Sequence, residues 1–152
     1  MGIDELQRAL SSHQVVLLDT MVFSYYLANH PRYVDLAGAV LDAIETGQVA
    51  GLTTTVTVAK VLTVPAQAGD PNALLDYELY LTHFPNLEIM PLDMDVARET
   101  ARVRAATGLR TPDAVQVAAA QLAGADAIVT NDRRWQGRFR EPALLMLDMY
   151  VD

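Results

Sequence analysis

Hydrophobic and polar positions along the chain follow two alternating patterns. Short apolar runs predict buried strands at residues 15–18, 49–54, 87–90, 127–129 and 144–147. Between them, apolar residues recur at helical spacing and predict helices at residues 2–10, 23–27, 35–46, 57–66, 72–84, 94–107 and 112–120. Strands that alternate with helices are typical of a parallel sheet covered on both faces. The pattern therefore predicts an α/β chain folded as a three-layer α/β/α sandwich with a central, mainly parallel sheet.

The length of 152 residues and the lack of a linker-like segment favour a single domain over residues 1–152, with residues 1–13 as a short N-terminal helical extension. Asp4 and Glu5 near the N-terminus are untypical of a signal peptide, and no apolar run approaches membrane-spanning length. We therefore expect a cytoplasmic chain that does not enter a membrane.

Three aspartates stand at the ends of predicted elements. Asp19 and Asp132 each follow a buried strand. Asp113 falls in the first turn of a buried helix, after Thr111 as the expected N-cap and Pro112 as the first helical residue. Because ligands of open α/β sheets bind at the carboxyl ends of the strands, we expect the three carboxylates to converge there. Taken singly, Asp113 also fits a helix-favouring acid and Asp132 a turn residue.

The formal net charge of −8 limits the partners of such a site. An acidic chain does not bind nucleic acid through its overall charge, so a nucleic-acid enzyme of this kind needs metal ions and local arginines. A basic protein segment is the alternative partner. Arg133 and Arg134 are candidate phosphate contacts, or simply part of a solvated turn. The chain has no cysteine, no metal-ligand spacing among its three histidines and no glycine-rich phosphate loop.

Three segments in this order resemble the PIN-domain family, and more narrowly the VapC-like toxins of type II toxin–antitoxin systems. They are residues 17–20 (Leu-Leu-Asp-Thr), 109–114 (Leu-Arg-Thr-Pro-Asp-Ala) and 129–132 (Val-Thr-Asn-Asp). The resemblance extends from about residue 15 to the last predicted strand. It implies a PIN-like fold and a metal-dependent endoribonuclease that hydrolyses RNA phosphodiesters with water activated by Mg²⁺ or Mn²⁺.

The resemblance also implies roles for particular residues. The family's catalytic, metal-holding acidic positions match Asp19, Asp113 and Asp132. The positions next to these acids are Thr20, Thr130 and Asn131. The implied partners are an RNA substrate, an antitoxin protein with a basic tail and a second copy of the chain in a homodimer.

One position departs from the family pattern. Family members commonly carry Thr-x-x-Glu-Val-Leu on the helix after the second strand, whereas residues 57–62 read Thr-Val-Ala-Lys-Val-Leu, with Lys60 at the glutamate position. An ammonium there would attract the aspartates and repel a divalent cation. At an effective dielectric of about 20, one unit pair at about 4 Å is worth roughly 4 kcal/mol before desolvation.

Several interpretations of Lys60 are open. A substitution has disarmed an otherwise intact enzyme, or the natural protein has lost catalysis and uses Lys60 as an internal counter-ion. Alternatively, the aspartates still hold one metal ion with weak activity, or Lys60 is a solvated residue outside the site. A catalytically degenerate PIN fold would instead be a binding module whose acidic pocket receives a basic partner segment, which the net charge of −8 favours.

Overall fold

The computed structural model describes residues 2–152, and its helices and strands lie within three residues of the predicted bounds at each end. The strands are β1 (Val15–Leu18), β2 (Ala50–Thr54), β3 (Leu87–Met90), β4 (Ala127–Thr130) and β5 (Ala143–Met146). The helices are α1 (Gly2–Ser11), α2 (Thr20–Leu27), α3 (Val34–Glu45), α4 (Thr55–Gln67), α5 (Pro71–Thr82), α6 (Met94–Thr107) and α7 (Thr111–Leu122). Two short 3₁₀ turns complete the described part, η1 (Arg133–Trp135) and η2 (Leu147–Tyr150).

The strands form one sheet in the order β3-β2-β1-β4-β5, and every neighbouring pair is parallel. The predicted α/β/α class is therefore confirmed. The chain runs outward from β1 to β2 and β3, and then returns to the other side of β1 with β4 and β5. The boundary between β1 and β4 is thus the point where the strand order reverses, which is where open α/β sheets bind ligands.

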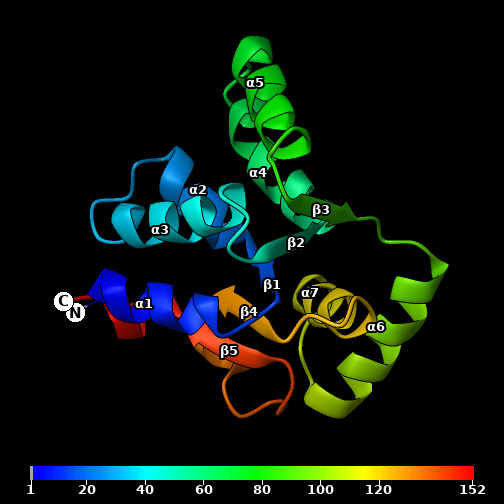
Figure 1. Cartoon of the computed structure of the whole chain (residues 1–152). Helices are drawn as coiled ribbons and strands as arrows, with labels where there is room; N and C mark the ends of the chain where they lie inside the picture. The colour runs from blue at the N-terminus through cyan, green and yellow to red at the C-terminus, as the bar shows by residue number, and fades with distance from the viewer. Residues whose placement is uncertain (1) are drawn as a thin grey trace.

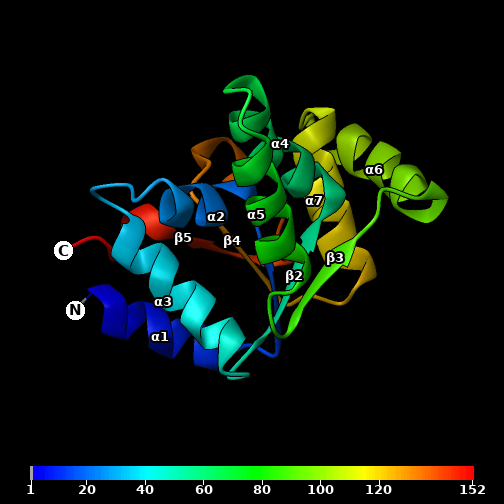
Figure 2. The same ribbon diagram turned by 90° about the horizontal axis from the view of Figure 1, so that it is seen from above.

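Helices cover both faces of the sheet (Figures 1 and 2). Val16 and Leu18 of β1 are fully buried on one face, in a core shared with α1, α2 and α3. Leu17, between them, is fully buried on the other face, in a core built with α6 and α7. This alternation holds β1 in the middle of the molecule, because each face of the strand contributes to a different core.

Helix α1 is built into the first of these cores. Leu6 and Leu10 are buried there, and the Gly2 amide donates a hydrogen bond to Asp152 Oδ1 at 2.8 Å. The two chain ends therefore lie side by side (Figure 1). Residue 1 of the extension predicted over 1–13 lies outside the described residues. Within residues 2–152, none of the helices combines the length and apolar character that crossing a bilayer requires.

The start of α7 differs from the prediction by one residue. Thr111 is already helical, and Arg110 takes the N-cap position in an extended conformation with no side-chain cap, so the prediction of Thr111 as N-cap is wrong. The N–H groups of the first helical turn have no intrahelical acceptor, so proline is tolerated at the second position as well as the first. The position of Pro112 therefore does not determine the exact residue at which α7 begins. Asp113 remains in the first turn.

Candidate active site

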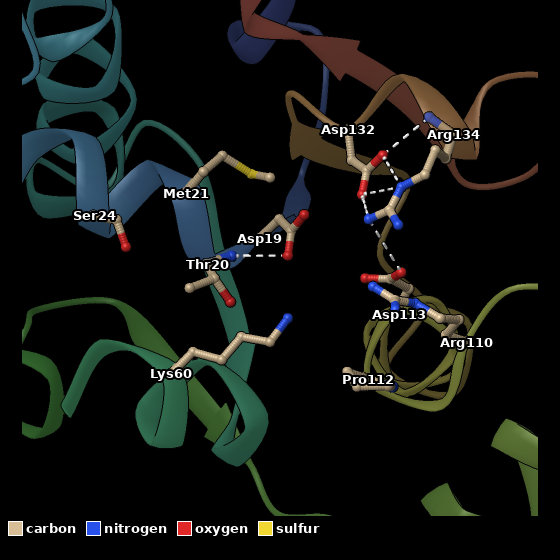
Figure 3. Close-up of a pocket in the computed structure, with 10 residues that line it drawn as sticks. All are labelled: Asp19, Thr20, Met21, Ser24, Lys60, Arg110, Pro112, Asp113, Asp132 and Arg134. Carbon is tan, nitrogen blue, oxygen red and sulfur yellow. Dashed lines mark hydrogen bonds and ion pairs between the residues drawn. The ribbon is translucent and has the colours of Figure 1, made fainter. Parts of the chain in front are cut away.

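A pocket of about 520 Å³ opens at the carboxyl ends of β1 and β4, between α2, α4 and the start of α7 (Figure 3). Its lining consists of Asp19, Thr20, Met21, Ser24, Lys60, Arg110, Pro112, Asp113, Asp132 and Arg134. The three aspartates singled out in the sequence therefore lie in one pocket, although 113 positions separate the first from the last. The same pocket contains the lysine that departs from the family pattern.

Asp19 is the most deeply buried acid of the pocket, with 4% of its surface exposed. It caps α2, where its Oδ1 accepts a hydrogen bond from the Thr20 amide at 2.8 Å, and its Oδ2 accepts one from Thr130 Oγ1 at 2.8 Å. Burial raises the pKa of Asp19, and the hydrogen bonds and the nearby charge of Lys60 act in the opposite direction. Both carboxylate oxygens are thus oriented by the protein.

Gln116 completes the surroundings of Asp19 and was not singled out in the sequence. It is fully buried on α7, and its Nε2 donates to Asp19 Oδ1 at 3.1 Å and to Thr57 Oγ1 at 2.8 Å. Its Oε1 accepts a hydrogen bond from Thr54 Oγ1 at 2.5 Å. This side chain of α7 therefore joins the N-cap of α2, the end of β2 and α4. The sequence signal that could have pointed to this residue is one glutamine within the apolar stretch 114–120.

Asp132 and Asp113 are both in contact with Arg134. The guanidinium donates to both carboxylate oxygens of Asp132, with Nη2–Oδ2 at 2.6 Å and Nε–Oδ1 at 2.9 Å. Nη2 also lies 3.8 Å from Asp113 Oδ2. The hydrogen bonds from Arg134 lower the pKa of Asp132, against the effect of partial burial, so this carboxylate is ionised at neutral pH. Arg134 therefore bridges two of the three acids.

Lys60 extends from α4 into the pocket, and its ammonium points toward Asp19 (Figure 3). Among the described residues it forms no direct ion pair, and it remains exposed. Burial keeps the pKa of Asp19 raised although the charge of Lys60 acts in the opposite direction, and the same charge makes a small contribution to the lowered pKa of Asp132. The ammonium thus acts on the acids through space across the pocket.

The charges that line the pocket cancel. Three carboxylates, those of Asp19, Asp113 and Asp132, face the cationic groups of Lys60, Arg110 and Arg134. No group of three or more histidine, cysteine, aspartate or glutamate side chains within residues 2–152 is arranged to hold a metal ion. A hard divalent cation needs several oxygen ligands and a surplus of negative charge. The residues as arranged therefore do not fit such a cation.

Asn131 and Arg133 lie next to the pocket but do not line it. Asn131 Oδ1 accepts a hydrogen bond from the Asp148 amide at 2.8 Å, and its Nδ2 donates to the Tyr25 hydroxyl at 3.1 Å. Arg133 Nη2 donates to Asp148 Oδ2 at 2.6 Å and lines a neighbouring cavity. In this structure, both residues hold the turn after β4 against the rest of the fold. A phosphate contact of Arg133 stays a prediction.

An all-parallel sheet with a pocket of aspartate, lysine and arginine side chains at its topological switch point defines a class of α/β proteins in which ligands bind at the carboxyl edge. Sequence comparison assigns the family within this class. The PIN domain profile matches residues 16–141, and the chain belongs to the PIN domain family. The predicted family is thereby confirmed. None of the curated proteins compared with the chain matches it in sequence.

Solved structures with the same fold include proteins of toxin–antitoxin complexes. A chain of VapBC2 from Rickettsia felis, bound to a DNA fragment from its promoter, is 15% identical, with a TM-score of 0.68 over 88% of this chain and 98% of that one. A chain of FitAcB from Neisseria gonorrhoeae is 21% identical, with a TM-score of 0.66 over 87% and 97%. VapC20 from Mycobacterium tuberculosis, a Sarcin–Ricin loop cleaving toxin, is 10% identical, with a TM-score of 0.65 over 83% and 97%. At these identities the likeness shows a shared fold.

Proposed function

We propose that this chain is a VapC-like toxin endoribonuclease whose activity is disarmed by Lys60. The observation that carries the proposal is the position of the Lys60 ammonium in one pocket with Asp19, Asp113 and Asp132. Membership of the PIN domain family supports the ribonuclease class. A structural relative that cleaves the Sarcin–Ricin loop supports RNA as the substrate.

In this proposal the three aspartates are the catalytic and metal-holding groups of the intact pocket, and RNA is the substrate. A bound Mg²⁺ or Mn²⁺ would supply an activated water and stabilise charge on the phosphate. Thr20 and Thr130 position Asp19 through their hydrogen bonds. The cation is absent or weakly held in the present sequence, because the positive charge of Lys60 offsets the negative charge that would attract it.

The alternative, a binding module that receives a basic segment, has less support from the geometry. Three cationic side chains already line the pocket, so its lining has no surplus negative charge to attract a further one. An antitoxin remains part of the proposal, because structural relatives occur in VapBC and FitAB complexes. We place the toxin and a basic-tailed antitoxin in the cytoplasm.

Cleavage of a structured RNA hairpin in the presence of Mn²⁺ tests the proposal. We expect Lys60→Glu to cleave about a hundredfold faster than the unchanged chain, a typical effect of one electrostatic group at a reacting centre. Lys60→Gln is the matched control, because it removes the ammonium without adding a carboxylate, and it should recover only part of this gain. Adding Asp19→Asn to Lys60→Glu should abolish cleavage. A Lys60→Glu protein that leaves the hairpin intact would refute the proposal.

A further inference from the structure

Among the described residues that line the pocket, Arg134 is the cation in direct contact with the acids. Its guanidinium covers both oxygens of Asp132 and reaches Asp113 Oδ2, whereas Lys60 touches neither acid directly. Within residues 2–152, this is the only polar side-chain contact of Asp113. Any ligand that needs these two carboxylates together must therefore displace Arg134.

The local fold holds Arg134 in this place. The Arg134 amide donates to Asp132 Oδ1 at 3.0 Å, so Asp132 caps the same 3₁₀ turn that carries the arginine. Trp135, the next residue, is fully buried in the core against α7 and fixes the turn. The guanidinium can consequently reach Asp132 from a fixed backbone, with only its own side chain to order. The planar fork of arginine suits two-point contact with a carboxylate.

We propose that Arg134 is an internal competitor for the pocket, which occupies Asp132 and Asp113 and must leave them before a divalent cation binds. This inference rests on the proposed function, because it concerns the cation that the restored site would take. Lys60 and Arg134 affect the acids in different ways. Lys60 acts on the acids through space, whereas Arg134 occupies the oxygens themselves. Replacing Lys60 alone therefore leaves one competitor in place.

The affinity for Mn²⁺, measured as free Mn²⁺ by electron paramagnetic resonance during titration, tests the inference in the Lys60→Glu background. Adding Arg134→Gln should lower the Kd for Mn²⁺ by about fivefold, the upper range expected for an exposed ion pair. Arg134→Lys keeps the charge but loses the two-point contact. In the Lys60→Glu background its Kd for Mn²⁺ should lie between that of Lys60→Glu alone and that of Lys60→Glu with Arg134→Gln.

Arg133→Gln is the matched control. Arg133 is on the same turn, is more exposed than Arg134 and also pairs with an aspartate, but it does not line the pocket. This variant should leave the Kd unchanged. The inference is overturned if Arg134→Gln leaves the Kd unchanged or raises it, or if Arg133→Gln lowers it equally. It is also overturned if no variant binds Mn²⁺.

The inference and the proposed function can fail separately. If Arg134→Gln tightens Mn²⁺ binding but no Lys60→Glu protein cleaves RNA, the role of Arg134 as a competitor is supported and the ribonuclease proposal fails. If Lys60→Glu cleaves RNA and Arg134→Gln does not tighten Mn²⁺ binding, the ribonuclease proposal is supported and the role of Arg134 as a competitor is refuted.

Discussion

At the scale of single residues, Asp19 shows the conflict between stability and chemistry in this pocket. Its carboxylate is almost completely buried, and burial raises its pKa above the ordinary value of 3.8. Hydrogen bonds from Thr20, Thr130 and Gln116 offset part of this penalty. A buried acid with an ionised form that is costly at neutral pH is typical of a residue kept for function.

We expect Asp19→Asn to raise Tm at pH 7 by about 2 °C or more. The amide keeps the shape of Asp19, its oxygen can accept from Thr20 and Gln116, and its nitrogen can face the Thr130 hydroxyl. A raised carboxyl pKa means that the folded chain binds protons more tightly, so ionisation lowers stability as pH rises through the folded pKa. The gain should therefore be present at pH 7 and shrink as the pH is lowered toward 3.8. Thermal melts followed by circular dichroism measure it, and a lower Tm at pH 7 would contradict the account.

At the scale of elements, Gln116 links α7 through hydrogen bonds to the N-cap of α2, the end of β2 and α4. Replacing it with leucine would leave Thr54, Thr57 and Asp19 each without one buried partner. We expect Gln116→Leu to lower the free energy of unfolding by about 1–3 kcal/mol, the cost of unsatisfied buried polar groups. Gln121→Leu on the same helix is the control, because Gln121 is exposed and should change stability little. Urea denaturation compares the two, and equal stability would argue against a structural role of Gln116.

The elements and the pocket were open to prediction to different degrees. Strands and helices follow periodic apolar patterns, and parallel strands end at one edge, so Asp19 and Asp132 were expected to be neighbours. Gln116 was missed because one glutamine within the apolar stretch 114–120 forms no periodic pattern, and its partners Thr54 and Thr57 are 62 and 59 positions away. The contact of Arg134 with Asp132 depends on a side-chain conformation, which residue order does not encode.

At the scale of the whole molecule, the homodimer stays a prediction. The α4–α5 pair stands away from the sheet (Figure 1) and exposes Val64, Leu75 and Leu79 at 66%, 54% and 43%. We expect light scattering to give the mass of two chains, and Leu79→Glu to shift it toward one, because burying an unpaired charge is costly. Leu122→Glu, on an exposed position of α7, should leave the mass unchanged. A monomer at all concentrations would contradict the prediction.

The charge balance of the pocket is the property on which the whole account depends. Lys60→Glu changes the charge of the lining by two units and leaves the acids in excess. Without a cation this crowding should lower Tm relative to the unchanged chain, because like charges then repel one another.

The most direct test is the change in Tm when Mn²⁺ is added. A ligand at a hundred times its Kd stabilises the folded state by about 2.7 kcal/mol, which corresponds to roughly 5–10 °C for a chain of this size. The account predicts a rise of this order for Lys60→Glu and a much smaller one for the unchanged chain. It would be contradicted if the unchanged chain gained as much as Lys60→Glu, or if Lys60→Glu gained nothing.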